Sequence, residues 1–196
     1  MQCNCGADVA KRVIGQLSNM KNEAKIFGVA GYSGSGKTSL IEQVIPRLVR
    51  VGLMVSLIKH SHHGFDIDRP GKDSYRHREA GASEVLIASS QRWVVMHELR
   101  GEAEPDLPEQ IARLSPCDLV LVEGFKRHPI PKLEVHRKQT GNDAGNESDR
   151  PLLYPGDPYV VALATNEKLD TQLPQFGLDD YDDVTEFILT YLELQK

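Results

Sequence analysis

Short apolar runs alternate with amphipathic stretches along much of this chain, a pattern typical of strands and helices that follow one another. The apolar runs Ile26–Ala30 and Met54–Lys59 enclose a stretch with helical spacing that ends before Gly52. A strand, a loop, a helix and a second strand in this order form the crossover unit of a parallel sheet. The pattern therefore predicts an α/β fold in which helices flank a mostly parallel sheet.

The second half of the chain supplies further strands. Leu119–Val122 is a continuous apolar run, as expected for a strand buried on both faces. Lys132–His136 alternates between polar and apolar residues, which predicts an edge or surface strand. Tyr159–Ala164 is the last predicted core strand, and it precedes a C-terminal helix with the inward-facing residues Val184, Phe187, Ile188, Tyr191 and Leu192.

An antiparallel hairpin is predicted between these elements. Glu84–Ser89 and Arg92–His97 both read as strands, and only Ser90 and Gln91 separate them. Parallel strands need a much longer connection, so this link predicts a hairpin added to the parallel sheet.

The second strand of this hairpin has bulky apolar groups on both faces, because Trp93 and Val95 lie on one face and Val94 and Met96 on the other. No helix is predicted to cover its outer edge, and an uncovered edge of this kind favours association. We expect the strand to pair with its counterpart in a homodimer. The alternative is that the chain's own strand Leu133–His136 covers it.

The segment Gly31–Thr38 reads Gly-Tyr-Ser-Gly-Ser-Gly-Lys-Thr and lies between the first predicted strand and the first predicted helix. This is the P-loop pattern, and it places the chain in a P-loop NTPase-type α/β class. Glycines let backbone N–H groups converge on phosphate oxygens, and the helix N-terminus adds partial positive charge. Lys37 would reach the β- and γ-phosphates, and Thr38 would offer its hydroxyl to Mg²⁺. The predicted nucleotide-binding residues are Gly31, Ser33, Gly34, Ser35, Gly36, Lys37, Thr38 and Ser39.

A flexible glycine turn before a helix is the alternative interpretation of this segment, and the strand before it disfavours that interpretation. A nucleotide–Mg²⁺ site also needs a carboxylate at the end of a neighbouring strand. Asp118 and Glu123 bracket one strand and lie about 16 Å apart, so only one can reach the ion. Glu123 is at the carboxyl end, where open α/β sheets bind ligands. We therefore predict Glu123 as a metal ligand and, with Lys37, as a catalytic residue, and we give Asp118 a structural role.

The second predicted strand also ends at this edge of the sheet, with Lys59 and His60. We expect both residues to line the phosphate side. A metal site built from His62 and His63 is the alternative, but adjacent side chains in an extended segment point in opposite directions. Asp68 follows in the same loop and is predicted to support Mg²⁺.

Base recognition is predicted from the segment 165–170, which resembles the Asn-Lys-x-Asp sequence of G-proteins with one residue inserted. Asn166 would then contact the base. The alternative is that Asn166 only turns the chain, a role for which asparagine is well suited.

Length and composition limit the other possibilities. The chain has 196 residues, of which 40% are hydrophobic, enough for one domain of ordinary size. We expect a P-loop domain over residues 25–196, preceded by a poorly ordered extension over residues 1–24. The formal net charge of −5 argues against a nucleic-acid partner.

The sequence also predicts where the protein works. No apolar run approaches the ~20 residues of a membrane span, and residues 1–25 lack the apolar core of a signal peptide. Cys3, Cys5 and Cys117 are an odd number of cysteines without a disulfide framework. A metal site at Cys3 and Cys5 is the alternative, but nothing nearby completes four ligands. We predict a cytoplasmic protein without a membrane partner.

Several blocks in this order resemble the MobB family of molybdopterin-guanine dinucleotide biosynthesis adapter proteins: Gly31–Thr38, Lys59–His63, Arg69–Tyr75, Ala80–Ala82, Gln91–Trp93 and Leu119–Lys126. The Pro-Gly-Lys-Asp-Ser and Val-Glu-Gly-Phe-Lys blocks are the specific ones. The resemblance covers the chain from about Lys25 onward. The extension before Lys25 and the loop Gln139–Arg150 fall outside the pattern expected of the family.

The resemblance implies a homodimeric protein that binds GTP with Mg²⁺, hydrolyses it weakly at most, and assists a MobA-type guanylyltransferase in attaching GMP to molybdopterin. Two alternatives are a P-loop kinase of a small metabolite and a homodimeric scaffold that its nucleotide stabilises. A kinase needs an arginine-bearing lid over the phosphates. Arg127, Arg137 and Arg150 could serve, but no arginine-rich lid helix is evident, which favours nucleotide binding over phosphoryl transfer.

Overall fold

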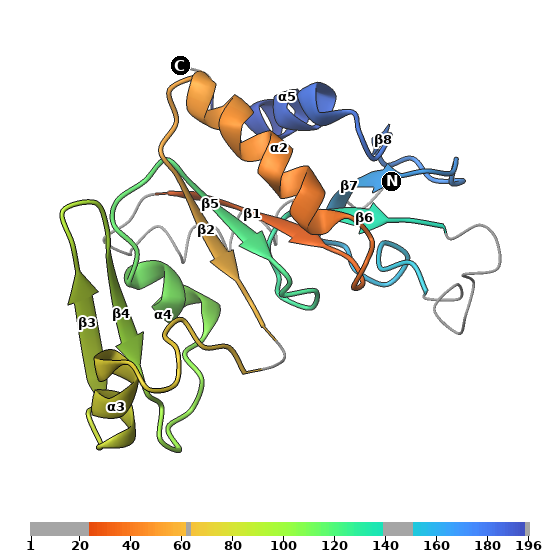
Figure 1. Ribbon diagram of the computed structural model, residues 1–196. Helices are drawn as coiled ribbons and strands as arrows, with labels where there is room; N and C mark the ends of the chain where they lie inside the picture. Colours follow the sequence, from red (N-terminus) through yellow and green to blue (C-terminus); the bar gives the residue numbers. More distant parts are fainter. Residues whose placement is uncertain (1–23, 62–63, 139–150, 195–196) are drawn as a thin grey trace. The chain divides into compact units, whose positions relative to one another are not determined.

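The computed structural model describes residues 24–61, 64–138 and 151–194 (Figure 1). The predicted features at Cys3, Cys5, His62, His63 and the loop 139–150 therefore lie outside the described residues. The chain divides into two compact units. One comprises residues up to His60 together with those from Pro108 onward, and the other is Ser61–Leu107.

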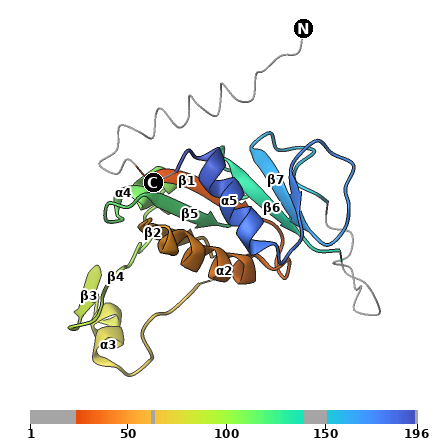
Figure 2. The same ribbon diagram turned by 90° about the horizontal axis from the view of Figure 1, so that it is seen from above.

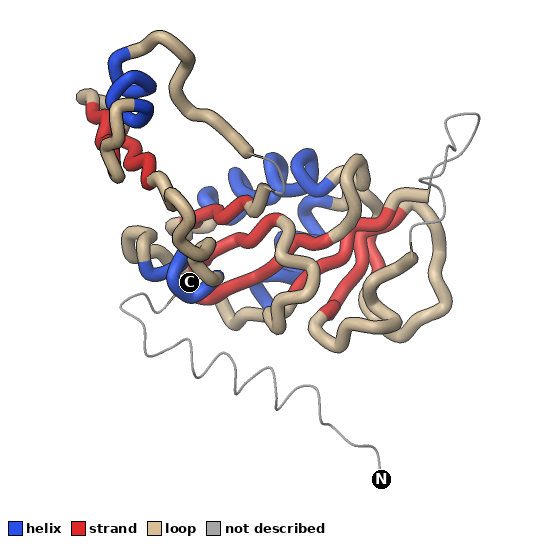
Figure 3. The backbone as a smooth tube through the Cα atoms, turned by 90° about the horizontal axis from the view of Figure 1, so that it is seen from below, coloured by secondary structure: helices blue, strands red, loops and turns tan. Residues whose placement is uncertain are grey.

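The first unit is built on a parallel six-stranded sheet, as the sequence predicts. Its strands have the order β2-β5-β1-β6-β7-β8, and every pair of neighbours is parallel. Figure 3 shows these strands side by side from below. The short β8 has no counterpart in the predicted pattern. The strands are β1 (Lys25–Ala30), β2 (Val55–Lys59), β5 (Leu119–Glu123), β6 (Lys132–His136), β7 (Val160–Thr165) and β8 (Gln175–Phe176).

Two helices cover one face of this sheet, α2 (Lys37–Arg50) and α5 (Tyr181–Tyr191), and they lie side by side in Figures 1 and 2. Their apolar residues recur every three or four positions, which places them on the face that meets the sheet. A short helix, α4 (Leu107–Ala112), precedes β5. The core between helices and sheet includes Phe27, Leu40, Ile41, Val44, Leu48, Leu121, Leu133, Val184 and Ile188.

The prediction that Lys132–His136 is an edge or surface strand is wrong. β6 lies inside the sheet, between β1 and β7, and Lys132 is 1% exposed. The Lys132 ammonium donates hydrogen bonds to the carbonyls of Lys126 (3.0 Å) and His128 (2.7 Å) and pairs with Asp157 (2.7 Å). A polar residue in an alternating strand is thus buried because it has dedicated partners, two carbonyls just before the strand and one carboxylate 25 residues later.

Glu134 is the second buried polar residue of β6 and is also 1% exposed. Its carboxylate accepts hydrogen bonds from the backbone N–H groups of Leu153 (2.8 Å) and Tyr154 (2.9 Å). Burial raises the pKa of Glu134, and these backbone bonds counteract part of that rise. The carboxylate therefore fixes the segment before β7 against the sheet.

The second unit contains the predicted hairpin, formed by β3 (Glu84–Ala88) and β4 (Trp93–His97), together with the helix α3 (Asp73–Glu79). The two strands pair antiparallel, with Leu86 opposite Val95. This confirms the hairpin, which forms a two-stranded sheet of its own.

A buried arginine holds the second unit together. The Arg78 guanidinium donates hydrogen bonds to both oxygens of Asp68 (2.7 and 3.2 Å), and it also pairs with Glu98 (2.6 Å) and Asp66 (3.1 Å). These bonds connect α3 with the loop before it and with the end of β4. Because three carboxylates surround one guanidinium, α3 stays attached to the hairpin although the unit has a small apolar core.

Within the described ranges, no helix has the length and apolar character that crossing a membrane requires.

The buried pair in β6 gives a testable prediction. Lys132→Met keeps a long side chain but leaves the Asp157 carboxylate and two carbonyls without their donor, and we expect it to lower the free energy of unfolding by about 3–5 kcal/mol. Lys138→Met is the matched control, because the Lys138 side chain is 60% exposed in its pair with Glu167. We expect that control to cost less than about 1 kcal/mol. Urea unfolding measures both values, and equal small losses would show that the buried pair does not hold β6 in place.

Candidate nucleotide site

The loop after β1 has the backbone conformation that its glycines predict. Gly31 has φ +145°, and a Cβ there would collide with the Val135 carbonyl oxygen of β6. Gly36 has φ +103° and is the N-cap of α2. Residues with a side chain are strained at these positive φ angles. Glycine is therefore needed both where the loop leaves the sheet and where the helix begins. The loop can therefore lie against the sheet and end at the N-terminus of a helix, as an anion-binding loop requires.

Lys37, the first residue of α2, folds back over the loop. Its ammonium donates a hydrogen bond to the Tyr32 carbonyl at 2.7 Å. The Tyr32 ring lies beneath Lys126, whose Nζ is 4.1 Å from the ring centroid. The buried Ser35 hydroxyl has no hydrogen-bond partner among the described residues. The loop thus has two ammonium groups beside it and one buried hydroxyl without a partner among the described residues.

The other predicted loop residues occupy the turn and the first helical turn. Ser33 and Gly34 are exposed in the turn, and Thr38 and Ser39 are exposed in the first turn of α2. Their exposure leaves this surface of the loop accessible to a ligand.

Glu123 and Thr38 meet beside the loop. Glu123 ends β5 and is 7% exposed, and its Oε1 accepts a hydrogen bond from the Thr38 hydroxyl at 3.2 Å. Its Oε2 lies 3.4 Å from the Lys59 ammonium, because β2 and β5 pair with Lys59 opposite Glu123. Thr38 and Lys59, which were predicted from separate motifs, therefore converge on the Glu123 carboxylate.

Asp118 lies at the other end of β5, where its carboxylate accepts a hydrogen bond from the Met54 backbone N–H at 2.7 Å. It has the structural role that its position predicts. His60 follows β2 and donates its backbone N–H to the Glu123 carbonyl at 3.1 Å. Its ring lies 5.0 Å from the Phe125 ring, centroid to centroid. The sheet therefore places His60 next to Glu123, while its side chain contacts the loop after β5.

Asp68 belongs to the second unit, where both of its carboxylate oxygens bind Arg78. The hydrogen bond from Arg78 lowers the pKa of Asp68. Its predicted support of Mg²⁺ stays a prediction, and the structure shows it in an ion pair.

Asn166 follows β7, and its side-chain amide makes two hydrogen bonds to the backbone of Lys138. Its Oδ1 accepts from the Lys138 N–H at 2.7 Å, and its Nδ2 donates to the Lys138 carbonyl at 2.9 Å. It also lines a cavity of about 380 Å³ with Phe176 and Gln175. The Gln175 side-chain amide makes two hydrogen bonds to the backbone of Leu169, and these bonds hold Gln175 in the wall of this cavity. A base-binding role for Asn166 stays a prediction.

Two basic residues beside the loop were not predicted as binding residues, although Arg137 was considered as a lid arginine. Lys126 faces Tyr32, and Arg137 lies near the loop, where a Cβ on Gly36 would be 3.5 Å from its Nη2. Each basic residue follows the carboxyl end of a central strand, and this was the available sequence signal. Within the described parts of the chain, no three His, Cys, Asp or Glu side chains gather closely enough to hold a metal ion.

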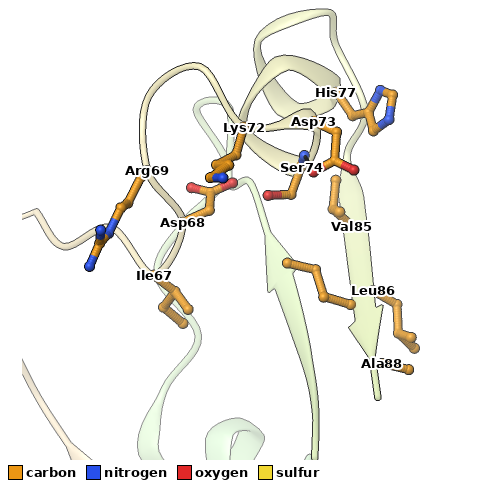
Figure 4. Close-up of a pocket in the computed structure, with 11 residues that line it drawn as sticks. Ile67, Asp68, Arg69, Lys72, Asp73, Ser74, His77, Val85, Leu86 and Ala88 are labelled. Atoms are coloured by element: carbon orange, nitrogen blue, oxygen red, sulfur yellow. Dashed lines mark hydrogen bonds between the residues drawn. The ribbon is translucent and has the colours of Figure 1, made fainter.

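The second unit has a cavity of its own, of about 530 Å³ (Figure 4). The loop before α3 and the start of α3 line one side, and β3 lines the other. Of the predicted site residues, only Asp68 lies there. The labelled lining residues are Ile67, Asp68, Arg69, Lys72, Asp73, Ser74, His77, Val85, Leu86 and Ala88.

A glycine loop that joins a central parallel strand to a helix N-terminus, with a carboxylate at the end of the adjacent strand, is the arrangement of P-loop α/β proteins. The chain is a protein of this class. It belongs to the MobB family, described as molybdopterin guanine dinucleotide synthesis protein B, whose pattern it matches over residues 26–165.

Relatives and solved structures agree with this family. The chain is 41% identical to a molybdopterin-guanine dinucleotide biosynthesis adapter protein of Haemophilus influenzae over 88% of the chain and 92% of that protein. It is 37% identical to the molybdopterin-guanine dinucleotide biosynthesis adapter protein of Escherichia coli, over 90% of the chain and 98% of that protein. The crystal structure of a molybdopterin-guanine biosynthesis protein B superposes with a TM-score of 0.64 at 27% identity, covering 85% of this chain and 99% of that one. These findings confirm the family and the fold predicted from the sequence.

The first prediction for the site concerns its cation. Lys37→Ala removes the ammonium at the start of α2, and we expect GTP affinity to fall by roughly two orders of magnitude or more. The fold should persist, because Lys37 is not a core residue. Calorimetric titration measures the affinity and circular dichroism the fold. Lys25→Ala, at the opposite end of β1, is the control, and equal GTP affinity in wild type and Lys37→Ala would refute the P-loop assignment.

The second prediction concerns the carboxylate. Glu123→Gln removes one negative charge with little change of shape, so it should weaken Mg²⁺-dependent GTP binding and spare binding measured in EDTA. Asp118→Asn, at the other end of the same strand, is the matched control. An equal loss with and without Mg²⁺ would assign Glu123 a role in folding.

Proposed function

We propose that this protein binds GTP with Mg²⁺ at the P-loop and acts as an adapter for a MobA-type guanylyltransferase that attaches GMP to molybdopterin. The observation that carries this proposal is the convergence of Thr38, Glu123 and Lys59 beside the loop. The adapter role is that of the family, and the two relatives are named as adapter proteins.

The residues present fit a nucleoside triphosphate. The Ser35 hydroxyl is buried without a partner among the described residues, and Gly31 keeps the loop clear of a side chain where it approaches β6. The loop N–H groups and Lys37 would hold the phosphates. Thr38 and Glu123 would hold Mg²⁺, which binds by one or two protein oxygens together with substrate phosphates. The ion would neutralise phosphate charge, and these side chains would orient it.

The site favours binding over rapid turnover. The Glu123 carboxylate accepts a hydrogen bond from Thr38 and pairs with Lys59. A carboxylate with these partners, at the end of a strand beside the loop, suits a metal ligand better than a general base that takes a proton from water. We propose slow hydrolysis at most. The relatives named as adapters also favour this function over the kinase alternative. The protein would act in the cytoplasm, where GTP and the guanylyltransferase meet.

The function is tested in a reconstituted reaction. Purified guanylyltransferase, molybdopterin and GTP are combined with and without this protein, and the formation of molybdopterin guanine dinucleotide is measured. The proposal expects more product with wild type than with Lys37→Ala, together with calorimetric preference for GTP over ATP. No stimulation by wild type, or equal stimulation by Lys37→Ala, would contradict it.

We also propose that the hairpin forms a homodimer with a second copy of the chain. Leu86, Trp93 and Val95 lie on one face of the hairpin and are 62%, 66% and 41% exposed. Each strand of the hairpin pairs only with the other within the described residues. The alternative cover, the strand Leu133–His136, is excluded because it lies in the main sheet. A second copy would bury these apolar groups and pair an edge.

The dimer predicts that a substitution in the apolar face of the hairpin lowers the molar mass measured in solution. Wild type should scatter light as a dimer at micromolar concentration, and Val95→Asp should shift it toward the monomer because it places a charge in the apolar face. Met54→Asp, at an exposed apolar residue of the first unit, is the control. A monomeric wild type, or a Val95→Asp variant that stays dimeric, would count against this interface.

A further inference from the structure

Arg137 reaches the P-loop from the strand on the other side of β1. It follows β6 directly, and its Nη2 lies 3.5 Å from the place where a Cβ on Gly36 would be. Gly36 is the N-cap of α2, where the backbone N–H groups of the loop lead into the helix. The guanidinium is therefore beside the part of the loop that carries the positive end of the helix dipole.

Within the described ranges, the Arg137 guanidinium is exposed and is held by neither a hydrogen bond nor an ion pair. Its neighbour Lys138, in contrast, pairs with Glu167 at 2.7 Å. The buried Ser35 hydroxyl of the same loop also has no partner among the described residues. An exposed guanidinium that has no ion pair among the described residues and lies next to a helix N-terminus fits an anionic ligand.

The backbone on both sides of Arg137 is held by the residues that follow β7. Before it, the His136 ring contacts the Glu167 carboxylate at 3.2 Å. After it, the Lys138 backbone is bound twice by Asn166, and the Lys138 ammonium binds Glu167. The hydrogen bond from Lys138 lowers the pKa of Glu167. Asn166 and Glu167 thus restrain the main chain that carries Arg137.

We propose that Arg137 is a phosphate ligand of the P-loop site and that Asn166 is its positioning residue. An arginine fork presents two parallel N–H donors to phosphate oxygens, and holding its backbone in place reduces the entropy lost on binding. Asn166 then acts through the Lys138 backbone and does not read the base. This inference rests on the proposed phosphate-binding function of the loop, and it adds a cation supplied by β6.

The test uses inorganic tripolyphosphate and GTP as separate probes, titrated by calorimetry at one fixed ionic strength. Arg137→Ala should weaken binding of both probes by about ten- to a hundred-fold, the value of a charge-assisted hydrogen bond. Arg137→Lys keeps the charge without the fork and should recover only part of the loss. Arg50→Ala, at the other end of α2, removes the same charge about 20 Å away and should leave affinity unchanged.

Asn166→Ala separates the two roles of Asn166. If Asn166 positions Arg137, its loss weakens tripolyphosphate and GTP alike, although tripolyphosphate has no base. In an Arg137→Ala background the Asn166→Ala change should then add little, because the effects of coupled residues are not additive. A loss confined to GTP, or full additivity of the two changes, would overturn the positioning role.

The outcomes also separate this inference from the proposed function. Unchanged tripolyphosphate affinity in Arg137→Ala, with a large loss in Lys37→Ala, would overturn the role of Arg137 and leave the nucleotide site standing. Tripolyphosphate binding that depends on Arg137, without any GTP preference, would support Arg137 and contradict the GTP-specific function.

Discussion

The close approach of the P-loop to β6 is the constraint on which the site depends. Gly31 lies against the Val135 carbonyl, and no residue with a Cβ fits there. Because the loop leaves β1 at this contact, the start of α2, Lys37 and Thr38 are all placed by it. The parallel sheet then brings the carboxyl ends of β5 and β2 to the same edge, which is why Glu123 and Lys59 meet Thr38.

β6 connects this edge to the rest of the protein. It presents Val135 to the loop and Arg137 to the start of α2, while its buried Lys132 and Glu134 bind the segments that lead to β7. A buried polar group needs a fully formed set of partners, so these bonds specify one position for the strand. β6, the strand against which the loop lies, is in this way held in place by its contacts with the segments before β7.

The sequence predicted those features that depend on local chemistry. The glycine loop, the parallel crossover and the hairpin each follow from residues within a short window, and the structure has all three. The prediction that Lys132–His136 is an edge or surface strand failed because Lys132 is buried against Asp157, which lies 25 residues away. No periodicity in the sequence shows such a pair. Asn166 was interpreted from a motif, and its contact with Lys138 exists only because β6 and β7 are neighbours in the sheet. Side-chain pairs between distant segments that no motif marks were therefore beyond prediction from one sequence.

The most direct test of the central claim, that β1, β5 and β6 build one phosphate site, is a crystal structure with Mg²⁺ and a non-hydrolysable GTP analogue. We expect the phosphates in the loop, with the Lys37 ammonium and the Arg137 guanidinium on their oxygens and Mg²⁺ beside Thr38 and Glu123. Phosphates bound elsewhere, such as in the cavity beside β3, would contradict the claim. So would a nucleotide in the loop that touches neither Lys37 nor Arg137.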